Sequence, residues 1–283
     1  PARSRRVTFA SSRHTYSPAI NCKLLNIRSL KSKSLLIRDD LLRHDVDIFM
    51  LTETWLTPCS TSTISECTPN GYSFLHRDRG DKTGGGVAVI ARDSLGCTEV
   101  CMSHGSTFES LAVRASNPQL PIIIVIYRPP STPVSQFLND FYDLLTQALL
   151  FKRPVALLGD FNIHVDDLND PNAKSFLDML SVFGLSQHIK NSTHSGGHTL
   201  DLLITRDIIP SAVSVSPLNL SDHCSVSFLL PTTPQQISST TSCLRRTLNS
   251  ATPNKLVSHI HEAGLLTTSV NPDDPNEIVN ALI

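Results

Sequence analysis

The stretch that decides the fold is "VALLGDFNIH", residues 155–164, in which an apolar run ends in an acid and an amide. The run has the length and composition of a buried strand, and residues two apart on a strand point to the same side. Asp160 and Asn162 would therefore face one way, while Phe161 points back into the core. A carboxylate and a carboxamide at the mouth of a buried strand indicate a polar site at that edge of a sheet.

Short apolar segments of the same kind recur along the chain. They are rich in Val, Ile and Leu and are bounded by Gly, Pro, Ser or Asn, which is typical of strands. The expected strands are 21–26, 46–52, 72–76, 86–92, 108–115, 121–127, 154–159, 199–205 and 224–230. Many strands with few helices predict two sheets packed face to face with helices outside.

Three helices are predicted between these strands, at 33–44, 134–150 and 172–183, from apolar residues at helical spacing. In the first helix the expected apolar stripe is Leu35, Leu36, Leu41 and Leu42. The third helix should begin at Asp170-Pro171, because Asp is a good N-cap and Pro fits the first turn.

The composition is that of an ordinary globular protein. The 283 residues are 40% hydrophobic and 17% charged, with a formal net charge of -1, whereas a tight non-specific DNA binder is usually basic. Any contact with DNA should therefore be local. The seven cysteines form no CxxC pair and no zinc spacing, which favours reduced thiols in an intracellular protein. No apolar stretch approaches the roughly 20 residues that a membrane helix needs.

The chain divides into three parts by composition. Residues 1–20 lack periodicity and are expected to be a poorly ordered lead. Residues 21–230 are expected to form the compact domain. Residues 231–283 begin with a stretch rich in Pro, Thr, Ser and Gln, and we expect a linker and short helices leading toward a missing downstream region.

Polar side chains also follow or precede other predicted strands. Taken singly each has a simple structural explanation; the GDFN tetrapeptide, for example, is often an Asx turn. If two sheets meet at one edge, however, they would bring together Asn26, Glu53, Tyr127, Asp160, Asn162, Asp201, Asp222 and His223. This set offers hard oxygen ligands for Mg²⁺, donors for phosphate oxygens, and an imidazole with carboxylate partners. Such an inventory suits phosphodiester hydrolysis.

The order Asn, Glu, Tyr, Asp-x-Asn, Asp and then Ser-Asp-His resembles the endonuclease/exonuclease/phosphatase superfamily. The longer sequence motifs around these residues give a more specific resemblance, to the apurinic-type endonuclease domain of non-LTR (LINE-type) retrotransposons. It is carried by "NIRSLKSK", "DIFMLTETWL", "GGGVAV", "YRPP", "GDFNIH", "FLDMLSVFGLSQHI" and "STHSGGHTLDLLIT". The resemblance covers about 21–230. It implies an α/β fold, a four-layer α/β sandwich whose two mixed, mainly antiparallel sheets pack face to face with helices outside.

The resemblance also implies a metal site. Glu53 would ligate Mg²⁺, for which Mn²⁺ can substitute, with Asn26 beside it and Asp222 close to the metal. One Mg²⁺ is expected, and the choice between one and two metals stays open. Repair-type relatives often carry an Asp two residues after the first Asn, where this chain has Arg28. Less carboxylate around the metal matches retroelement relatives better than repair enzymes.

The catalytic roles follow from the same resemblance. Asp160 would accept the proton of the attacking water, and Asn162 would orient that water or the phosphate. Tyr127 would donate to a phosphate oxygen. Asp201 would hydrogen-bond His223, fixing its tautomer and keeping it charged against the phosphate. The expected substrate-binding residues are Thr193, Ser221 and Arg128.

For three further features we expect a structural role rather than a role in binding the substrate. The glycines at 84–86 are expected to form a hairpin turn rather than a phosphate cradle. Trp55 is expected to pack in the core or at the rim rather than to stack on a base. His194 and His198 should flank a short hairpin beside the cleft.

The sequence therefore predicts a Mg²⁺-dependent DNA endonuclease that nicks target DNA and leaves a 3′-hydroxyl to prime reverse transcription in retrotransposition. No Y/F-x-D-D polymerase motif is present, so a reverse transcriptase would lie downstream in a longer parent polyprotein, or be lost. The expected partners are double-stranded DNA, that reverse transcriptase domain and the element RNA, without a membrane, and nuclear access is implied.

Two alternatives stay open. One is a phosphoesterase of the same superfamily acting on another substrate, such as an apurinic site or a phosphoinositide. The other is an inactive retroelement-derived binding module, which the intact set of polar residues disfavours.

Overall fold

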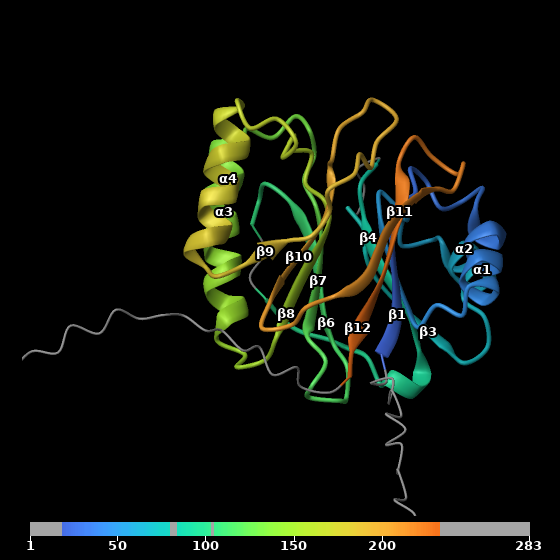
Figure 1. Ribbon diagram of the computed structural model, residues 1–283. Coiled ribbons are helices and arrows are strands. Elements are labelled where there is room, and N and C mark those ends of the chain that lie inside the picture. The colour runs from blue at the N-terminus through green and yellow to red at the C-terminus, as the bar shows by residue number, and fades with distance from the viewer. Residues whose placement is uncertain (1–18, 80–83, 103–104, 233–283) are drawn as a thin grey trace, which may run out of the picture. The chain divides into compact units, whose positions relative to one another are not determined.

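The computed structural model describes residues 19–79, 84–102 and 105–232 (Figure 1). Most of the predicted lead and of the predicted C-terminal region lies outside these residues, so the division of the chain stays a prediction there. Two residues assigned to the lead, Ala19 and Ile20, belong instead to the first strand, where they pair with the last one.

The first sheet has six strands, with two parallel neighbours at its centre. Their order is β11 (Ser211–Pro217), β12 (Cys224–Pro231), β1 (Ala19–Asn26), β2 (Ile48–Thr52), β4 (Val87–Arg92) and β3 (Tyr72–Arg77). Only β1 and β2 are parallel; every other neighbouring pair is antiparallel. A short 3-10 helix, η1 (Asp93–Leu95), follows β4.

The second sheet repeats this plan. Its order is β5 (Thr98–Glu99), β6 (Glu109–Arg114), β7 (Ile122–Tyr127), β8 (Val155–Asp160), β10 (Asp201–Arg206) and β9 (Ser186–Gln187). Here β7 and β8 form the parallel central pair. The other neighbours in this sheet are antiparallel.

Helices cover the outer face of each sheet, as Figure 1 shows. They are α1 (Ser34–Arg43) and α2 (Thr61–Cys67) on the first sheet, and α3 (Val134–Leu149) and α4 (Pro171–Val182) on the second. One apolar core fills the space between the sheets, and one lies between each sheet and its helices. The four-layer α/β sandwich with two mixed, mainly antiparallel sheets is therefore confirmed.

All nine predicted strands and all three predicted helices are present, with ends shifted by no more than two residues. The Asp170 side chain accepts from the backbone N–H of Asn172, as expected of the N-cap of α4. Five elements were not predicted: β5, β9, β11, α2 and η1. Two of them are strands of two residues, too short for a periodic pattern to reveal.

The apolar stripe predicted for α1 is mostly wrong. Leu41 is buried as expected, but Leu35 is 59% exposed, and Leu36 and Leu42 also face outward. The helix instead buries Asp40, whose carboxylate lies 2.6 Å from the ammonium group of Lys23 on β1. The buried face of the helix is therefore Ser34, Ile37, Asp40 and Leu41, and it can include Asp40 because a paired charge can be buried where an unpaired one cannot.

The two parallel pairs end at one place. In β1 and β2, Asn26 is paired with Thr52 at the C-terminal ends, and in β7 and β8, Tyr127 is paired with Asp160. The sheets pack with β1 against β8 and β2 against β7. The polar residues that follow these strands are thereby brought to a shared edge of the two sheets.

Candidate active site

Asn26 joins the two sheets at this edge. Its Nδ2 donates to Oε1 of Glu53 at 2.9 Å and to Oδ2 of Asp160 at 2.8 Å, although 134 residues separate Asn26 from Asp160. Asn26 is fully buried and Glu53 is partly exposed. One amide group therefore fixes two carboxylates from different layers beside each other.

The backbone is unusual where it presents these side chains. Glu53 and Asn162 have φ of 51° and 49°, a left-handed region that costs a non-glycine residue of order 1–3 kcal/mol. Asn162 donates from its backbone N–H to Asp160 Oδ1 at 3.0 Å and from its amide to the carbonyl of Arg128 at 2.8 Å. Asp160 and Asn162 are thus adjacent through an Asx turn rather than through continued strand alternation.

Asp201 and His223 form the opposite side of the site. The carboxylate Oδ2 lies 2.7 Å from the imidazole Nδ1, and both side chains are buried. Asp201 is also the register partner of Asp160 between β10 and β8. Asp160, Asp201 and His223 place ligand-type atoms within 4.8 Å of one another.

These buried groups shift one another's ionisation. Burial, and then the neighbouring Asp201 carboxylate, raise the pKa of Asp160 to about 7. Burial alone would lower the pKa of His223, but the hydrogen bond to Asp201 and the nearby carboxylates outweigh it and raise that pKa to about 9. At neutral pH these pKa values favour a charged imidazole and leave Asp160 near the midpoint of its titration.

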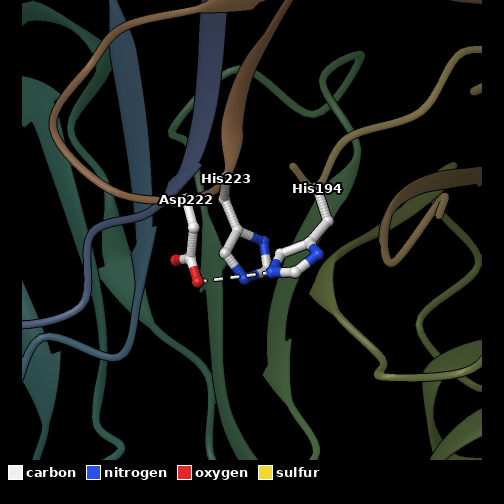
Figure 2. A group of neighbouring side chains, drawn as sticks. All are labelled: His194, Asp222 and His223. Carbon is white, nitrogen blue, oxygen red and sulfur yellow. Dashed lines mark hydrogen bonds and ion pairs between the residues drawn. The ribbon is translucent and has the colours of Figure 1, made fainter. Parts of the chain in front are cut away.

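Asp222 lies between two cationic or hydrogen-bonding partners. Arg28 forms an ion pair with its Oδ2, and Nε2 of His194 lies 3.3 Å from the same atom. Figure 2 shows Asp222, His194 and His223 facing one another, and their ligand-type atoms lie within 4.8 Å. The Nδ1 of His194 accepts from the N–H of Gly196 at 3.0 Å, so a neutral His194 carries its proton on Nε2 and donates to Asp222.

The electrostatics of Asp222 follow from these partners. Burial alone would raise its pKa, but a backbone hydrogen bond and the charge of Arg28 lower it below its usual value. Its Oδ1 is buried without a hydrogen-bond partner among the described residues. An ionised carboxylate with an unsatisfied oxygen is a suitable ligand for a hard cation.

Among the described residues, two groups of side chains could hold a metal ion, His194 with Asp222 and His223, and Asp160 with Asp201 and His223; Glu53 belongs to neither group. Glu53, Asn26 and Asp222 supply oxygen atoms, and Mg²⁺ prefers a few such oxygens together with water and substrate phosphate. Both oxygens of Glu53 accept a hydrogen bond, from Asn26 and from Trp55, yet a carboxylate has about four lone-pair sites in total. Lone pairs therefore remain free to bind a cation.

Thr193 and Ser221 position the site from beneath. Thr193 is fully buried, and its hydroxyl accepts from the N–H groups of Leu200 and Asp201 at 3.0 and 2.9 Å. The Ser221 hydroxyl donates to the carbonyl of Asn26 at 2.6 Å and accepts from the N–H of His223 at 3.1 Å. These contacts hold the backbone around Asp201 and His223, and a contact of either hydroxyl with phosphate stays a prediction.

Arg128 is not placed as a substrate-binding residue, contrary to the prediction. It is buried, and its guanidinium donates to the carbonyls of Phe161, Asn162 and Thr132. These bonds tie the chain after β7 to the chain after β8. Tyr127 beside it lies at the site, as the register partner of Asp160. Burial, and then the charges of Glu53 and Asp160, raise the pKa of its phenol, which therefore stays protonated at neutral pH.

Three contacts at the site were missed by sequence reasoning. They are the bonds of Arg28 and His194 to Asp222 and the bond of Trp55 to Glu53. Trp55 is 44% exposed and lies at the rim, one of the two predicted positions. The hairpin of His194 and His198 is present, and the Gly197 N–H donates to the His194 carbonyl at 2.9 Å. The only sequence signal for these three contacts is that Arg28, His194 and Trp55 lie close in sequence to the predicted site residues.

The fold and the site define a hydrolase of the four-layer α/β-sandwich class. The chain belongs to the endonuclease/exonuclease/phosphatase family, whose model matches residues 23–223. That range runs from β1 to His223, so it includes every residue of the candidate site.

Solved structures share this fold. The endonuclease domain of TRAS1, a telomere-specific non-LTR retrotransposon, has a TM-score of 0.58 at 15% identity and covers 76% of this chain and 99% of its own. An AP endonuclease from Archaeoglobus fulgidus has a TM-score of 0.58 at 14% identity, covering 75% and 99%. The 3′ phosphatase NExo from Neisseria, bound to a product DNA hairpin, has 0.55 at 16%, covering 74% and 98%. A comparison with curated proteins finds no significant match.

Among the residues that the structure describes, no helix has both the length and the apolar character needed to cross a membrane. The six cysteines within these residues are free thiols, as expected, and the seventh, Cys243, lies outside them.

Proposed function

We propose that this protein is a Mg²⁺-dependent DNA endonuclease that nicks one strand of double-stranded target DNA and leaves a 3′-hydroxyl. The observation that carries the proposal is the double hydrogen bond of Asn26, which joins Glu53 and Asp160 within one site. A metal-ligand carboxylate and a proton-accepting carboxylate are the two groups that phosphodiester hydrolysis needs side by side.

Glu53, Asn26 and Asp222 would hold the cation, whose charge would stabilise negative charge on the phosphate. Asp160, with a pKa of about 7, accepts the proton of the attacking water at neutral pH. Its position is fixed by Asn26 on one oxygen and by the backbone of Asn162 on the other.

The opposite side of the site supplies donors to the phosphate. Asp201 holds Nδ1 of His223, which leaves the Nε2–H of the charged imidazole for a phosphate oxygen. The phenol of Tyr127 is a second donor. Asn162 keeps its amide oriented through the bond to Arg128, so that it can orient water or phosphate.

DNA is favoured as the substrate by the retrotransposon-like sequence blocks. The likeness to the TRAS1 endonuclease domain agrees with this choice. A 3′-hydroxyl at the nick would prime reverse transcription, with a reverse transcriptase domain and the element RNA as partners in a parent polyprotein. Such a target requires access to the nucleus.

The test is nicking of supercoiled plasmid by the full chain, with Mg²⁺ and with a chelator. We expect open circles only with Mg²⁺, strong loss in Asp160→Asn, and wild-type activity in Asp178→Asn, an exposed acid on α4. A parallel panel holds an apurinic-site duplex and a soluble phosphoinositide. Turnover of the phosphoinositide without any nicking would overturn the proposal.

A further inference from the structure

Trp55 completes the hydrogen bonding of Glu53. Its indole Nε1 donates to Oε2 of Glu53 at 3.2 Å, while Asn26 donates to Oε1. Each oxygen of the carboxylate therefore has one donor, and the side chain is fixed from both ends. The indole N–H is a neutral donor with no acceptor capacity, so it orients the carboxylate without adding a positive charge that would repel a cation.

The backbone around Trp55 is built for this contact. Trp55 and Glu53 both have positive φ, at 54° and 51°. The N–H of Trp55 donates to the carbonyl of Gly85 at 2.8 Å, and the N–H of Thr54 donates to the carbonyl of Gly86 at 3.2 Å. The segment after β2 is thus tied to the glycine run that precedes β4.

The glycine run permits this close approach. A Cβ at Gly85 would collide with the Arg79 guanidinium, and a Cβ at Gly86 would lie 2.5 Å from the Thr54 hydroxyl. Both glycines also have positive φ, which disfavours other residues. The absence of a side chain at Gly86 therefore lets Thr54, which lies between Glu53 and Trp55, approach the run, whereas the space beside Gly85 is filled by Arg79 and Glu109.

We propose that Trp55 is a positioning residue that orients Glu53 toward the divalent cation. The inference rests on the proposed function, because it assigns Glu53 to the cation. Groups that orient metal ligands contribute about 10–100-fold to metal affinity. The indole is 44% exposed and is hydrogen-bonded to the carboxylate, so we expect its emission to change when that carboxylate binds an ion.

The chain offers a direct reporter, because Trp55 is its only tryptophan. Its emission can be followed while Mg²⁺ is added to the full protein and then removed with a chelator. The matched control is Tyr142→Trp in a Trp55→Phe chain, since Tyr142 is an exposed aromatic residue on α3, away from the candidate site. We expect reversible, saturable change for Trp55 and none for the control tryptophan.

Trp55→Phe keeps a flat ring but removes the N–H donor. We expect the Mg²⁺ concentration for half-maximal nicking to rise about tenfold, with little change in rate at saturating Mg²⁺ and in the midpoint of thermal unfolding. A merely structural role would lower the rate or the midpoint without this separation.

The outcomes distinguish the two proposals. Unchanged emission of Trp55 at saturating Mg²⁺, or the same Mg²⁺ dependence of nicking in wild type and Trp55→Phe, would overturn the role of Trp55 while leaving the nuclease intact. A reversible emission change that is absent in Glu53→Gln, in a protein that nicks no DNA, would support the role of Trp55 and reject the proposed function.

Discussion

His223 and Asp201 form a buried pair, with 2.7 Å between Nδ1 of the imidazole and Oδ2 of the carboxylate. Asp201 begins β10 in the second sheet, whereas His223 directly precedes β12 of the first sheet. The backbone N–H of Asp201 donates to the hydroxyl of Thr193. Because the hydrogen bond and the nearby carboxylates overcome burial, the pKa of His223 rises to about 9. The packing of the two sheets thus places beside His223 the carboxylates that favour its charged form.

Asp201→Asn removes that carboxylate while keeping the shape of the side chain. We expect the pKa of His223 to fall from about 9 toward or below its ordinary value of 6.5, because burial then opposes the charge with less compensation. NMR titration of the His223 ring protons measures it. Nicking at pH 8 should drop by about 10²–10⁴-fold, the range of one acid–base group. An unshifted titration would contradict the assignment.

Stability should depend on pH through the same residue. A raised folded-state pKa gives stabilisation that is complete below the unfolded value of 6.5 and lost as pH rises through about 9. We therefore expect the free energy of unfolding in chelator to fall between pH 7 and pH 10. His223→Gln should flatten that decline, and an equally steep decline in both proteins would show that other groups control it.

Mg²⁺ should stabilise the folded protein, because a cation that binds only the native state shifts the unfolding equilibrium. At 100 times its dissociation constant the gain is about 2.7 kcal/mol. Thermal unfolding with and without Mg²⁺ measures this gain. Glu53→Gln should lose most of it, whereas Glu66→Gln, on α2, should keep it.

Arg28 forms an ion pair with Asp222 and so offsets the negative charge of that carboxylate. Arg28→Asp should therefore increase carboxylate around the cation and lower the Mg²⁺ concentration for half-maximal activity several-fold. Arg38→Asp, an exposed residue on α1, is the charge-matched control. Equal shifts in both variants would indicate a general charge effect instead.

Gly159 permits the close pairing of β8 with β7 just before Asp160. Its φ is 140°, and an added Cβ would collide with the carbonyl of Ile126. Gly159→Ala should destabilise the protein by about 2–4 kcal/mol, measured by chemical denaturation. Gly197→Ala has a similarly positive φ but open space, so it should cost only about 1 kcal/mol. Equal costs would mean that the collision is relieved.

Much of the fold could be predicted because its central strands are continuously apolar. The apolar segments of β7 and β8 have the length and composition of buried strands. The polar residues at their ends can be identified directly from the sequence. The face of α1 could not be predicted, since the burial of Asp40 depends on Lys23 in another element. Strands of two residues, such as β5, carry no period at all.

The sequence predicted which residues lie at the site better than it predicted the hydrogen bonds that they make. Glu53, Asp160 and His223 were predicted to converge because each ends or begins a strand, and the structure brings them together. Arg128 was misjudged, since nothing local shows that its donors are taken by the backbone of residues 161 and 162. The partners of Asp222 were missed for the same reason: they come from distant loops.

The most direct measurement is the chemistry of the ends at a nick made in supercoiled plasmid. We expect the wild-type chain with Mg²⁺ to yield open circles that a DNA polymerase extends at once, without phosphatase treatment, because a 3′-hydroxyl is left. Open circles formed equally by Asp160→Asn and His223→Gln, or nicks that cannot be extended until a 3′-phosphate is removed, would contradict the account.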